Sequence, residues 1–525
     1  MKPLRLEDLT VEQKIGQLIV ARRTTNQADF DFALGLIRDH ALGGAQALPK
    51  EGVRQNVIDP VLQAADYPVF VAADMERGFQ LGDLQIAGNV ALGALDDPQA
   101  TYDFAKVTAM QAKQMGYNMI WSPDIDVAEH ECILRPLRVM GGIKELVAKH
   151  GIAYMRAFAD CGIVGTAKHF PSVFDRMEDS HMFEPESYHT KEELMNECLY
   201  PYRQILKALG SDMLGVMTSH DKLVNIDPNN PVTVSPKGVA LLREIGFDGL
   251  AITDSLAMMG IVQKYGDEAI PGLAIAAGHD MILPNYRIPL KDTYNYLLNA
   301  YRNGVFDEQR LNEACARVLR AQAFTMKQPA QKQITEQDRA TIQRINRDCI
   351  CAVTDRGLTP AIDRGKRHLF IILKNNIYEE GEAKDNYEIG FAKVWDPQKM
   401  AERFKILFPN SDVEYICEFP HRDQIERACA AAVSHDDVVF VTFCEPNAYQ
   451  GSDGLTERVR YLIRSMAYNI AAVVHVGNPY AMQKIVHVPR LIFGFPHITC
   501  MDALPLVLAG ELEARGRMPF NLKLN

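Results

Sequence analysis

Two side chains that can exchange a proton stand two positions apart at Asp179 and His181, at the end of a polar loop. In an extended loop, an aspartate and a histidine at this spacing can point the same way. A carboxylate bound to one ring nitrogen fixes the tautomer and raises the basicity of the other, which suits proton transfer near neutral pH. The pattern alone fits an ordinary solvated loop better, so its meaning depends on the residues around it.

Other polar residues stand where apolar runs of the sequence end. The loop itself begins after the apolar run 162–167. Contact with solvent at the end of a strand would explain a polar residue at any one of these positions. It is a poor explanation for polar residues at six of them. We therefore expect a shared site built from Asp74, Asp124, Lys168, His169, His220 and Asp254.

Eight apolar runs alternate with helical patterns over the first part of the chain, which predicts an α/β protein with a (β/α)8 TIM-type barrel. In a closed parallel barrel, the C-terminal ends of the strands gather at one face, where active sites form. The polar residues would meet at that face. The predicted strands span residues 18–22, 43–48, 69–74, 118–123, 164–169, 213–220, 250–254 and 280–284.

A second, smaller domain is expected after the barrel. The polar stretch that follows residue 326 has no apolar period and is typical of a linker, and we expect a bridging helix around residues 337–352. Five more strand-like runs, separated by helical patterns, predict an open α/β sandwich. The expected organisation is a barrel over residues 1–326, a linker and bridging helix over 327–355, and a sandwich over 356–525. The second set of strands spans residues 368–374, 413–418, 437–443, 471–477 and 490–494.

Two blocks of the sequence resemble glycoside hydrolase family 3. Residues 168–171 (Lys-His-Phe-Pro) and 179–181 (Asp-Ser-His) have the order and separation of the corresponding motifs in the family's β-N-acetylglucosaminidase branch. Residues 254–258 (Asp-Ser-Leu-Ala-Met) resemble the block that follows a later strand. Residues 475–480 and 510–519 look like second-domain signatures, so the likeness covers nearly the whole chain.

The resemblance implies a retaining, exo-acting glycoside hydrolase with Asp254 as nucleophile and His181 as acid/base, oriented by Asp179. Retention needs a carboxylate on one face of the sugar and a proton donor on the other. Judged by position alone, Asp254 is equally well explained as the N-cap of the next helix. A histidine also places less negative charge beside an acceptor than a glutamate, so phosphate stays open as the acceptor in place of water.

The same resemblance implies a set of residues that bind the sugar. Asp74 opens a block similar to Asp-X-Glu-X-Gly, although Phe79 stands where family members often have an arginine, and Arg77 is the candidate to replace it. Arg138 corresponds only thinly to the arginine of an Arg-Ser-Phe-Gly motif. Lys168 and His169 are suited to donating hydrogen bonds to hydroxyls. The implied substrate-binding residues are Asp74, Arg77, Arg138, Lys168, His169 and His220.

The chain departs from the family between its two matched motifs. Ser172-Val173-Phe174 replaces Gly-His-Gly, and serine and phenylalanine make the positive φ angles that glycine allows costly. We therefore expect the loop to follow a different path from one built on glycines.

Composition excludes several other classes of protein. A formal net charge of −11 argues against general nucleic-acid binding. No apolar run reaches membrane-spanning length and no secretory signal core is visible, so a cytoplasmic location with reduced cysteines is expected. No HExxH, Walker or dinucleotide-binding pattern occurs, and neither a metal nor a cofactor is predicted.

The sequence thus favours an enzyme that removes terminal β-linked N-acetylglucosamine or a related N-acetylhexosamine. Its partners would be a small amino-sugar glycoside and, in the phosphorolytic variant, phosphate. The oligomeric state is left open. Two other enzymatic functions stay open, those of a β-N-acetylglucosaminide phosphorylase and of a β-glucosidase of the same family. An alternative of a different class is a catalytically impaired sugar-binding protein on the same fold, which the altered loop and Phe79 support.

Overall fold

The chain forms two compact units, which we call the barrel unit and the second unit. The computed structural model describes residues 1–22, 27–128, 136–174, 178–329, 333–374, 395–444, 455–485 and 487–524. The barrel unit comprises Met1–Gln85, Pro98–His130 and Lys144–Thr341, and the second unit comprises Ile86–Asp97, Glu131–Ile143 and Ile342–Asn525. Two short segments from the first part of the chain therefore belong to the second unit.

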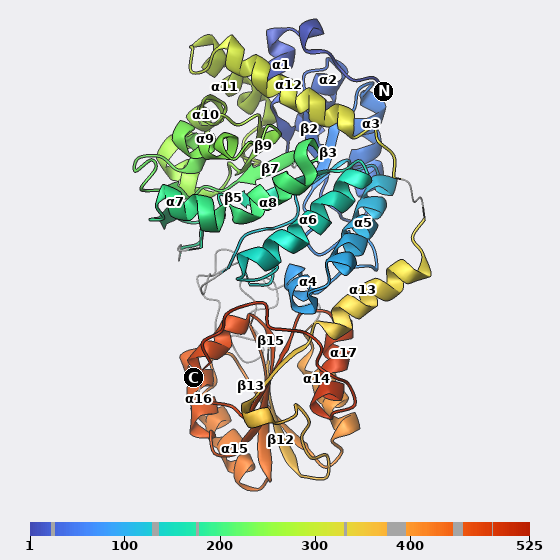
Figure 1. Cartoon of the computed structure of the whole chain (residues 1–525), viewed down its shortest axis with the longest axis vertical. Coiled ribbons are helices and arrows are strands. Elements are labelled where there is room, and N and C mark those ends of the chain that lie inside the picture. Colours follow the sequence, from blue (N-terminus) through green and yellow to red (C-terminus); the bar gives the residue numbers. More distant parts are fainter. Residues whose placement is uncertain are drawn as a thin grey trace. The chain divides into compact units, whose positions relative to one another are not determined.

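The barrel unit is built on an eight-stranded sheet in which every neighbouring pair is parallel (Figure 1). A parallel bridge between Ile19 and Ile282 joins the first strand to the last and closes the sheet. All eight predicted strands are confirmed, and so is the predicted fold class. The strands are β1 (Val20–Ala21), β2 (Gly44–Gln46), β3 (Phe70–Ala73), β4 (Met119–Ile120), β5 (Val164–Phe170), β7 (Gly215–Thr218), β9 (Leu250–Ser255) and β10 (Met281–Leu283).

Helices follow the strands and cover the outside of the sheet (Figure 1). Several begin at side chains that cap free backbone N–H groups, as Ser235 and Asp307 do for α9 and α12. The helices of this unit are α1 (Val11–Gln17), α2 (Gln27–Arg38), α3 (Asp59–Ala64), α5 (Pro98–Met115), α6 (Lys144–Asp160), α7 (Lys191–Glu193), α8 (Tyr200–Leu209), α9 (Pro236–Glu244), α10 (Met259–Ala277), α11 (Leu290–Arg302) and α12 (Glu308–Phe324). A two-stranded sheet, β6 (Glu186–Ser187) and β8 (Lys222–Leu223), joins two loops that follow strands.

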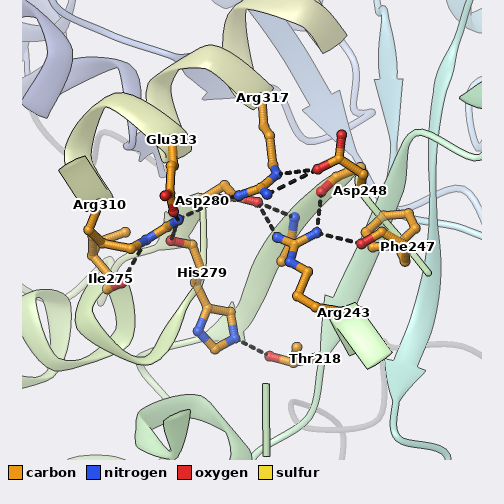
Figure 2. A network of polar contacts seen from close by, with 12 residues as sticks. Thr218, Arg243, Phe247, Asp248, Ile275, His279, Asp280, Arg310, Glu313 and Arg317 are labelled. Atoms are coloured by element: carbon orange, nitrogen blue, oxygen red, sulfur yellow. Dashed lines mark hydrogen bonds and ion pairs between the residues drawn. The ribbon is translucent and has the colours of Figure 1, made fainter. Parts of the chain in front are cut away.

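The N-terminal end of the barrel carries a dense network of ion pairs, shown in Figure 2. Asp280, just before β10, is fully buried and accepts from Arg243 Nη2 at 2.8 Å, Arg310 Nη2 at 2.5 Å and Arg317 Nη1 at 3.3 Å. It also accepts from the backbone N–H of Ala251 in β9. The three arginines come from α9 and α12, so one carboxylate ties two helices to two strands.

The second unit contains a six-stranded sheet that is parallel except at one edge. The sequence prediction was wrong at the edge strand β11 (Cys351–Thr354), because it continued the bridging helix to residue 352. The helix α13 (Glu336–Asp348) ends before this strand begins. Residues 351–354 pair antiparallel with β16, and this long-range pairing overrides the local helical pattern. The other strands are β12 (His368–Leu373), β13 (Asp412–Ile416), β14 (Asp437–Cys444), β15 (Ile470–Gly477) and β16 (Arg490–Gly494).

Helix α4 (Asn89–Leu95), although early in the sequence, packs inside the second unit. The Ala94 carbonyl accepts from Arg517 N at 2.8 Å, and the Asn346 side chain accepts from Ala87 N at 2.9 Å. The N–H of Gly142 donates to the Pro519 carbonyl at 2.9 Å. The unit is thus assembled from early and late parts of the chain. Its remaining helices are α14 (Pro397–Leu407), α15 (Arg422–Val433), α16 (Glu457–Ser465) and α17 (Ile498–Leu508).

Across the described residues, no helix is both long and apolar enough to cross a lipid bilayer. The described cysteines all carry free thiols, and most of them are buried.

Candidate active site

The residues predicted at strand ends come together at the C-terminal face of the barrel, because β3, β4, β5, β7 and β9 are consecutive neighbours in the sheet. Asp254, the last residue but one of strand β9, is half-buried. Among the described residues, the only hydrogen bond to its carboxylate comes from the backbone N–H of Ser255, at 2.6 Å from Oδ1. The other carboxylate oxygen is therefore available for chemistry.

The surroundings keep Asp254 ionised. Burial alone would raise the pKa of its carboxyl, but the neighbouring His169 and His220, the Ser255 N–H and Lys168 together hold that pKa far below its ordinary value. A carboxylate that is charged at every physiological pH is suited to act as a nucleophile rather than as a proton donor.

Lys168 connects the ends of β5 and β3. Its side chain is 2% exposed, and its Nζ lies 2.7 Å from Asp74 Oδ1 and 2.7 Å from Glu76 Oε1. Asp74 keeps half of its side-chain surface exposed, so it has room to meet a hydroxyl group. Arg77 is half-buried in the turn that follows. Glu76 was not among the predicted site residues, although it stands two positions from Asp74 in the same motif.

His169 is held by a second carboxylate that the sequence did not reveal. The carboxylate of Asp126 lies 3.0 Å from His169 Nδ1 and also accepts the backbone N–H of His169 at 3.0 Å. This pairing leaves Nε2 as the ring atom that can face a ligand. The prediction named Asp124 at the strand end, and Asp124 accepts the backbone N–H of Asp126 at 3.0 Å.

Asp124, Asp126 and His169 also bring three ligand atoms within 4.8 Å of one another, the spacing of a metal site. Both carboxylates accept hydrogen bonds from protein N–H groups, however, and His169 Nδ1 faces Asp126. The arrangement is explained by hydrogen bonding that fixes the β4 and β5 ends.

His220 is buried with both ring nitrogens engaged by the protein. Its Nδ1 lies 2.6 Å from Thr233 Oγ1, and its Nε2 lies 2.9 Å from the carbonyl oxygen of Ser255. Because a carbonyl can only accept, Nε2 carries the proton. Burial lowers the pKa of this imidazole, although the charge of Asp254 opposes the shift. His220 is thus placed to hold the backbone beside Asp254.

Asp179 and His181 form a hydrogen-bonded pair. His181 Nδ1 lies 2.7 Å from Asp179 Oδ1, and the same oxygen accepts the backbone N–H of His181 at 2.9 Å. Asp179 is buried, while the imidazole keeps 29% of its surface exposed. The Nε2 edge is therefore the part of the pair that a substrate can reach.

The loop that carries this pair is bonded to the start of α10, the helix that follows Asp254. The backbone N–H of Met259 donates to the carbonyl of His181 at 2.9 Å. A Cβ on Gly260 would lie 1.9 Å from the carbonyl oxygen of Phe183, so only glycine permits this close packing. The Asp179–His181 pair is thus bonded to the start of α10, the segment that directly follows Asp254 in the chain.

In the altered loop, Ser172 keeps a backbone conformation typical of the glycine that it replaces. Ser172 adopts a left-handed φ of 63°, the conformation that was expected to be costly for serine; the expected change of loop path would be wrong only if Phe174 were left-handed as well. Its Oγ accepts the backbone N–H of Val127 at 3.1 Å, which helps to offset the strain. Phe174 is not among the described non-glycine residues with positive φ, and its ring packs on His189 with centroids 4.5 Å apart.

Two further positions differ from a simple transfer of the family pattern. Arg138 belongs to the second unit, where its carbonyl accepts from Asn89 Nδ2 at 2.7 Å. The other predicted site residues all belong to the barrel unit. Phe79 is buried against Tyr117, with ring centroids 6.1 Å apart, and serves as a core residue.

The barrel unit is the part of the chain that matches a known protein family. The family model described as the glycosyl hydrolase family 3 N-terminal domain matches residues 10–321. The chain belongs to glycoside hydrolase family 3. It is 26% identical over 336 residues to a β-N-acetylglucosaminidase/β-glucosidase of Cellulomonas fimi, covering 61% of this chain and 58% of that protein. It is also 26% identical over 286 residues to β-hexosaminidase A of Pseudoalteromonas piscicida, covering 48% and 47%. The chain thus spans about half the length of these relatives.

Solved structures extend the likeness in fold to almost the whole chain. A family 3 β-N-acetylglucosaminidase from Paenibacillus sp. str. FPU-7 superposes with a TM-score of 0.78 at 24% identity, covering 98% of this chain and 100% of that one. The β-glucoside phosphorylase BglX superposes with a TM-score of 0.79 at 19% identity, covering 98% and 95%. These likenesses agree with a barrel followed by an α/β sandwich.

Proposed function

We propose that this protein is a retaining, exo-acting glycoside hydrolase that removes terminal β-linked N-acetylglucosamine or a related N-acetylhexosamine. The observation that carries the proposal is Asp254, an ionised and half-buried carboxylate with one oxygen that accepts no hydrogen bond from the described residues. Several curated relatives are named β-hexosaminidase, which supports the choice of an amino sugar.

In the first step, Asp254 attacks the anomeric carbon while His181 Nε2 gives its proton to the departing oxygen. Asp179 stabilises the imidazolium and holds the ring through Nδ1. The C1–O bond breaks and a glycosyl ester forms on Asp254. In the second step, His181, now neutral, takes a proton from water as the water attacks C1, and the carboxylate is released.

The remaining residues position the sugar and the nucleophile. Asp74 and His169 Nε2 would contact hydroxyl groups, with Lys168 and Asp126 fixing their orientation. His220 would act as a positioning residue through its bond to the Ser255 carbonyl. Arg77 remains a candidate contact. Arg138, which lies in the second unit, stays a candidate contact on the resemblance alone.

A panel of p-nitrophenyl glycosides tests this function. We expect turnover of the N-acetyl-β-glucosaminide, slower turnover of the β-glucoside, and release of the β-anomer of the sugar as the first product. Faster turnover of the β-glucoside would favour the β-glucosidase reading. No turnover of any glycoside, with sugar binding intact in calorimetry, would instead support the impaired sugar-binding protein.

A second candidate function is phosphorolysis. It is favoured by His181, because an imidazole in the acid/base position adds no fixed negative charge beside an incoming phosphate. The likeness in fold to a β-glucoside phosphorylase is consistent with it. Turnover measured with and without phosphate, with assay of sugar 1-phosphate, separates the two acceptors.

A further inference from the structure

Two arginines and a tyrosine form a cluster at the C-terminal face of the barrel, beside Asp254, and have no assigned role. Arg22 follows β1, and Tyr286 and Arg287 follow β10, the two strands at which the barrel closes. The guanidinium carbon of Arg22 lies 5.2 Å from the centre of the Tyr286 ring, and that of Arg287 lies 4.9 Å from it. One aromatic ring thus gathers two positive charges.

The cluster is bonded directly to the nucleophile's neighbour. Arg22 Nη1 donates to Ser255 Oγ, and the Ser255 N–H in turn donates to Asp254. Arg22 Nε also donates to Gln46 at the end of β2, at 3.2 Å. These bonds hold the guanidinium of Arg22 between the C-terminal ends of β9 and β2.

Arg287 is exposed and held in place without being neutralised. Its Nη1 donates to the carbonyl of Ala257 at 2.7 Å, and its backbone N–H donates to Asn285. Within the described part of the chain, no carboxylate lies within ion-pair distance of Arg287. A guanidinium that is oriented by a carbonyl and a ring has further N–H donors to offer to a planar or tetrahedral anion.

We infer that Arg22 and Arg287, arranged around Tyr286, bind an anionic group of the molecule that lies on the leaving-group side of Asp254. The inference rests on the proposed function for the identity of that side. The anionic group could come from two sources that have the same chemistry. One is a carboxylate or phosphate carried by the leaving group, and the other is free phosphate acting as the acceptor.

The charge of Asp254 makes this site sensitive to the stage of the reaction. In the free enzyme the ionised carboxylate repels a second anion, whereas in the glycosyl ester that charge is absent. If hydrogen phosphate is the acceptor, its unprotonated oxygen attacks C1 and the C1–Oδ bond breaks, with its electron pair returning to Asp254. The proton stays on the product sugar phosphate, and His181 regains its own proton from solvent.

Binding of inorganic phosphate measured by calorimetry tests the site without reference to turnover. We expect Arg287→Gln to weaken phosphate binding by about tenfold to a hundredfold, the range for losing one charge-assisted pair. Arg302→Gln, an exposed arginine at the far end of α11, should leave binding unchanged. Asp254→Asn should tighten it, because the competing charge is removed.

Kinetics then distinguish the two sources. Acceleration by phosphate with formation of sugar 1-phosphate, lost in Arg287→Gln, identifies free phosphate. A lower KM for a 4-carboxyphenyl glycoside than for the phenyl glycoside, also lost in Arg287→Gln, identifies an anionic leaving group. Phosphate binding that depends on Arg287, in an enzyme that cleaves no glycoside, would retain the site and reject the proposed function. Equal phosphate binding in wild type and Arg287→Gln, with no preference for the carboxyphenyl glycoside, would overturn the inference.

Discussion

The two ends of the barrel use similar side chains for opposite purposes. At the N-terminal end, Asp280 is fully buried and accepts from three arginines, so its charge is satisfied entirely by the protein (Figure 2). At the C-terminal end, Asp254 is half-buried and accepts a single backbone N–H from the described residues. Neighbouring side chains, Lys168 among them, help to keep it ionised without bonding to it in this way. A carboxylate with fixed partners contributes to stability, and one without them is available for chemistry.

The largest expected effect is at Asp254. Asp254→Asn should lower turnover of an aryl N-acetylglucosaminide by about three or more orders of magnitude, because the proposed nucleophile is lost. The melting temperature should hardly change, since few protein contacts depend on this carboxylate. Asp212→Asn, an exposed aspartate at the barrel's other end, is the matched control. Turnover within tenfold of wild type would reject Asp254 as the nucleophile.

His181→Ala should show a loss that depends on the leaving group. Poor leaving groups need protonation as they depart, so kcat/KM for an alkyl glycoside should fall by roughly a hundredfold to ten-thousandfold. An activated dinitrophenyl glycoside should lose much less in its first step. Asp179→Ala should give a milder version of the same pattern. Met182→Ala, exposed on the same loop, is the control, and equal losses on both substrates would contradict an acid role.

Asp280→Asn should behave in the opposite way to Asp254→Asn. Removing the carboxylate leaves buried guanidinium groups without their partner, which we expect to cost about 3 to 5 kcal/mol of unfolding free energy. Urea unfolding would measure this cost. Activity per folded molecule should remain close to wild type, because the network lies at the end of the barrel away from Asp254. A specific loss of kcat at a temperature where the variant is folded would break the comparison.

The smallest effect is the contribution of His279 to stability below neutral pH. Burial lowers the pKa of His279 to about 4, with both ring nitrogens bonded to Thr218 and Ala274. The unfolded chain binds this proton near pH 6.5 and the folded chain does not. Stability is therefore complete above pH 6.5 and falls by about 1.4 kcal/mol per unit towards pH 4. His279→Gln should flatten the slope of unfolding free energy against pH by that amount, and an unchanged slope would contradict it.

Much of the barrel could be predicted because each strand is a short apolar run that ends in a polar residue. Asp126 was missed because its role depends on pairing with His169 across neighbouring strands, and no local spacing reports such pairing. Glu76 stands in the quoted Asp-X-Glu-X-Gly block, but its pairing with Lys168 likewise appears only in the fold. β11 was missed for the same reason, since its partner β16 lies far along the chain. The left-handed Ser172 depends on an acceptor contact with Val127 that only the folded loops create. Arg287 was missed because nothing in its neighbourhood of sequence distinguishes it from a solvated surface arginine.

The interleaved composition of the second unit has a consequence for biosynthesis. Residues Asn89–Ala94 of α4 are all buried, yet the backbone that closes over them includes Arg517, near the end of the chain. All barrel strands have left the ribosome long before Arg517 is made, so the barrel can form while α4 still lacks its cover. A gene shortened after Thr341 would lack Asn346 and Arg517, which bond to the backbone of this segment. Such a truncation would remove only the later part of the second unit and would leave the buried residues of α4 without the backbone that covers them.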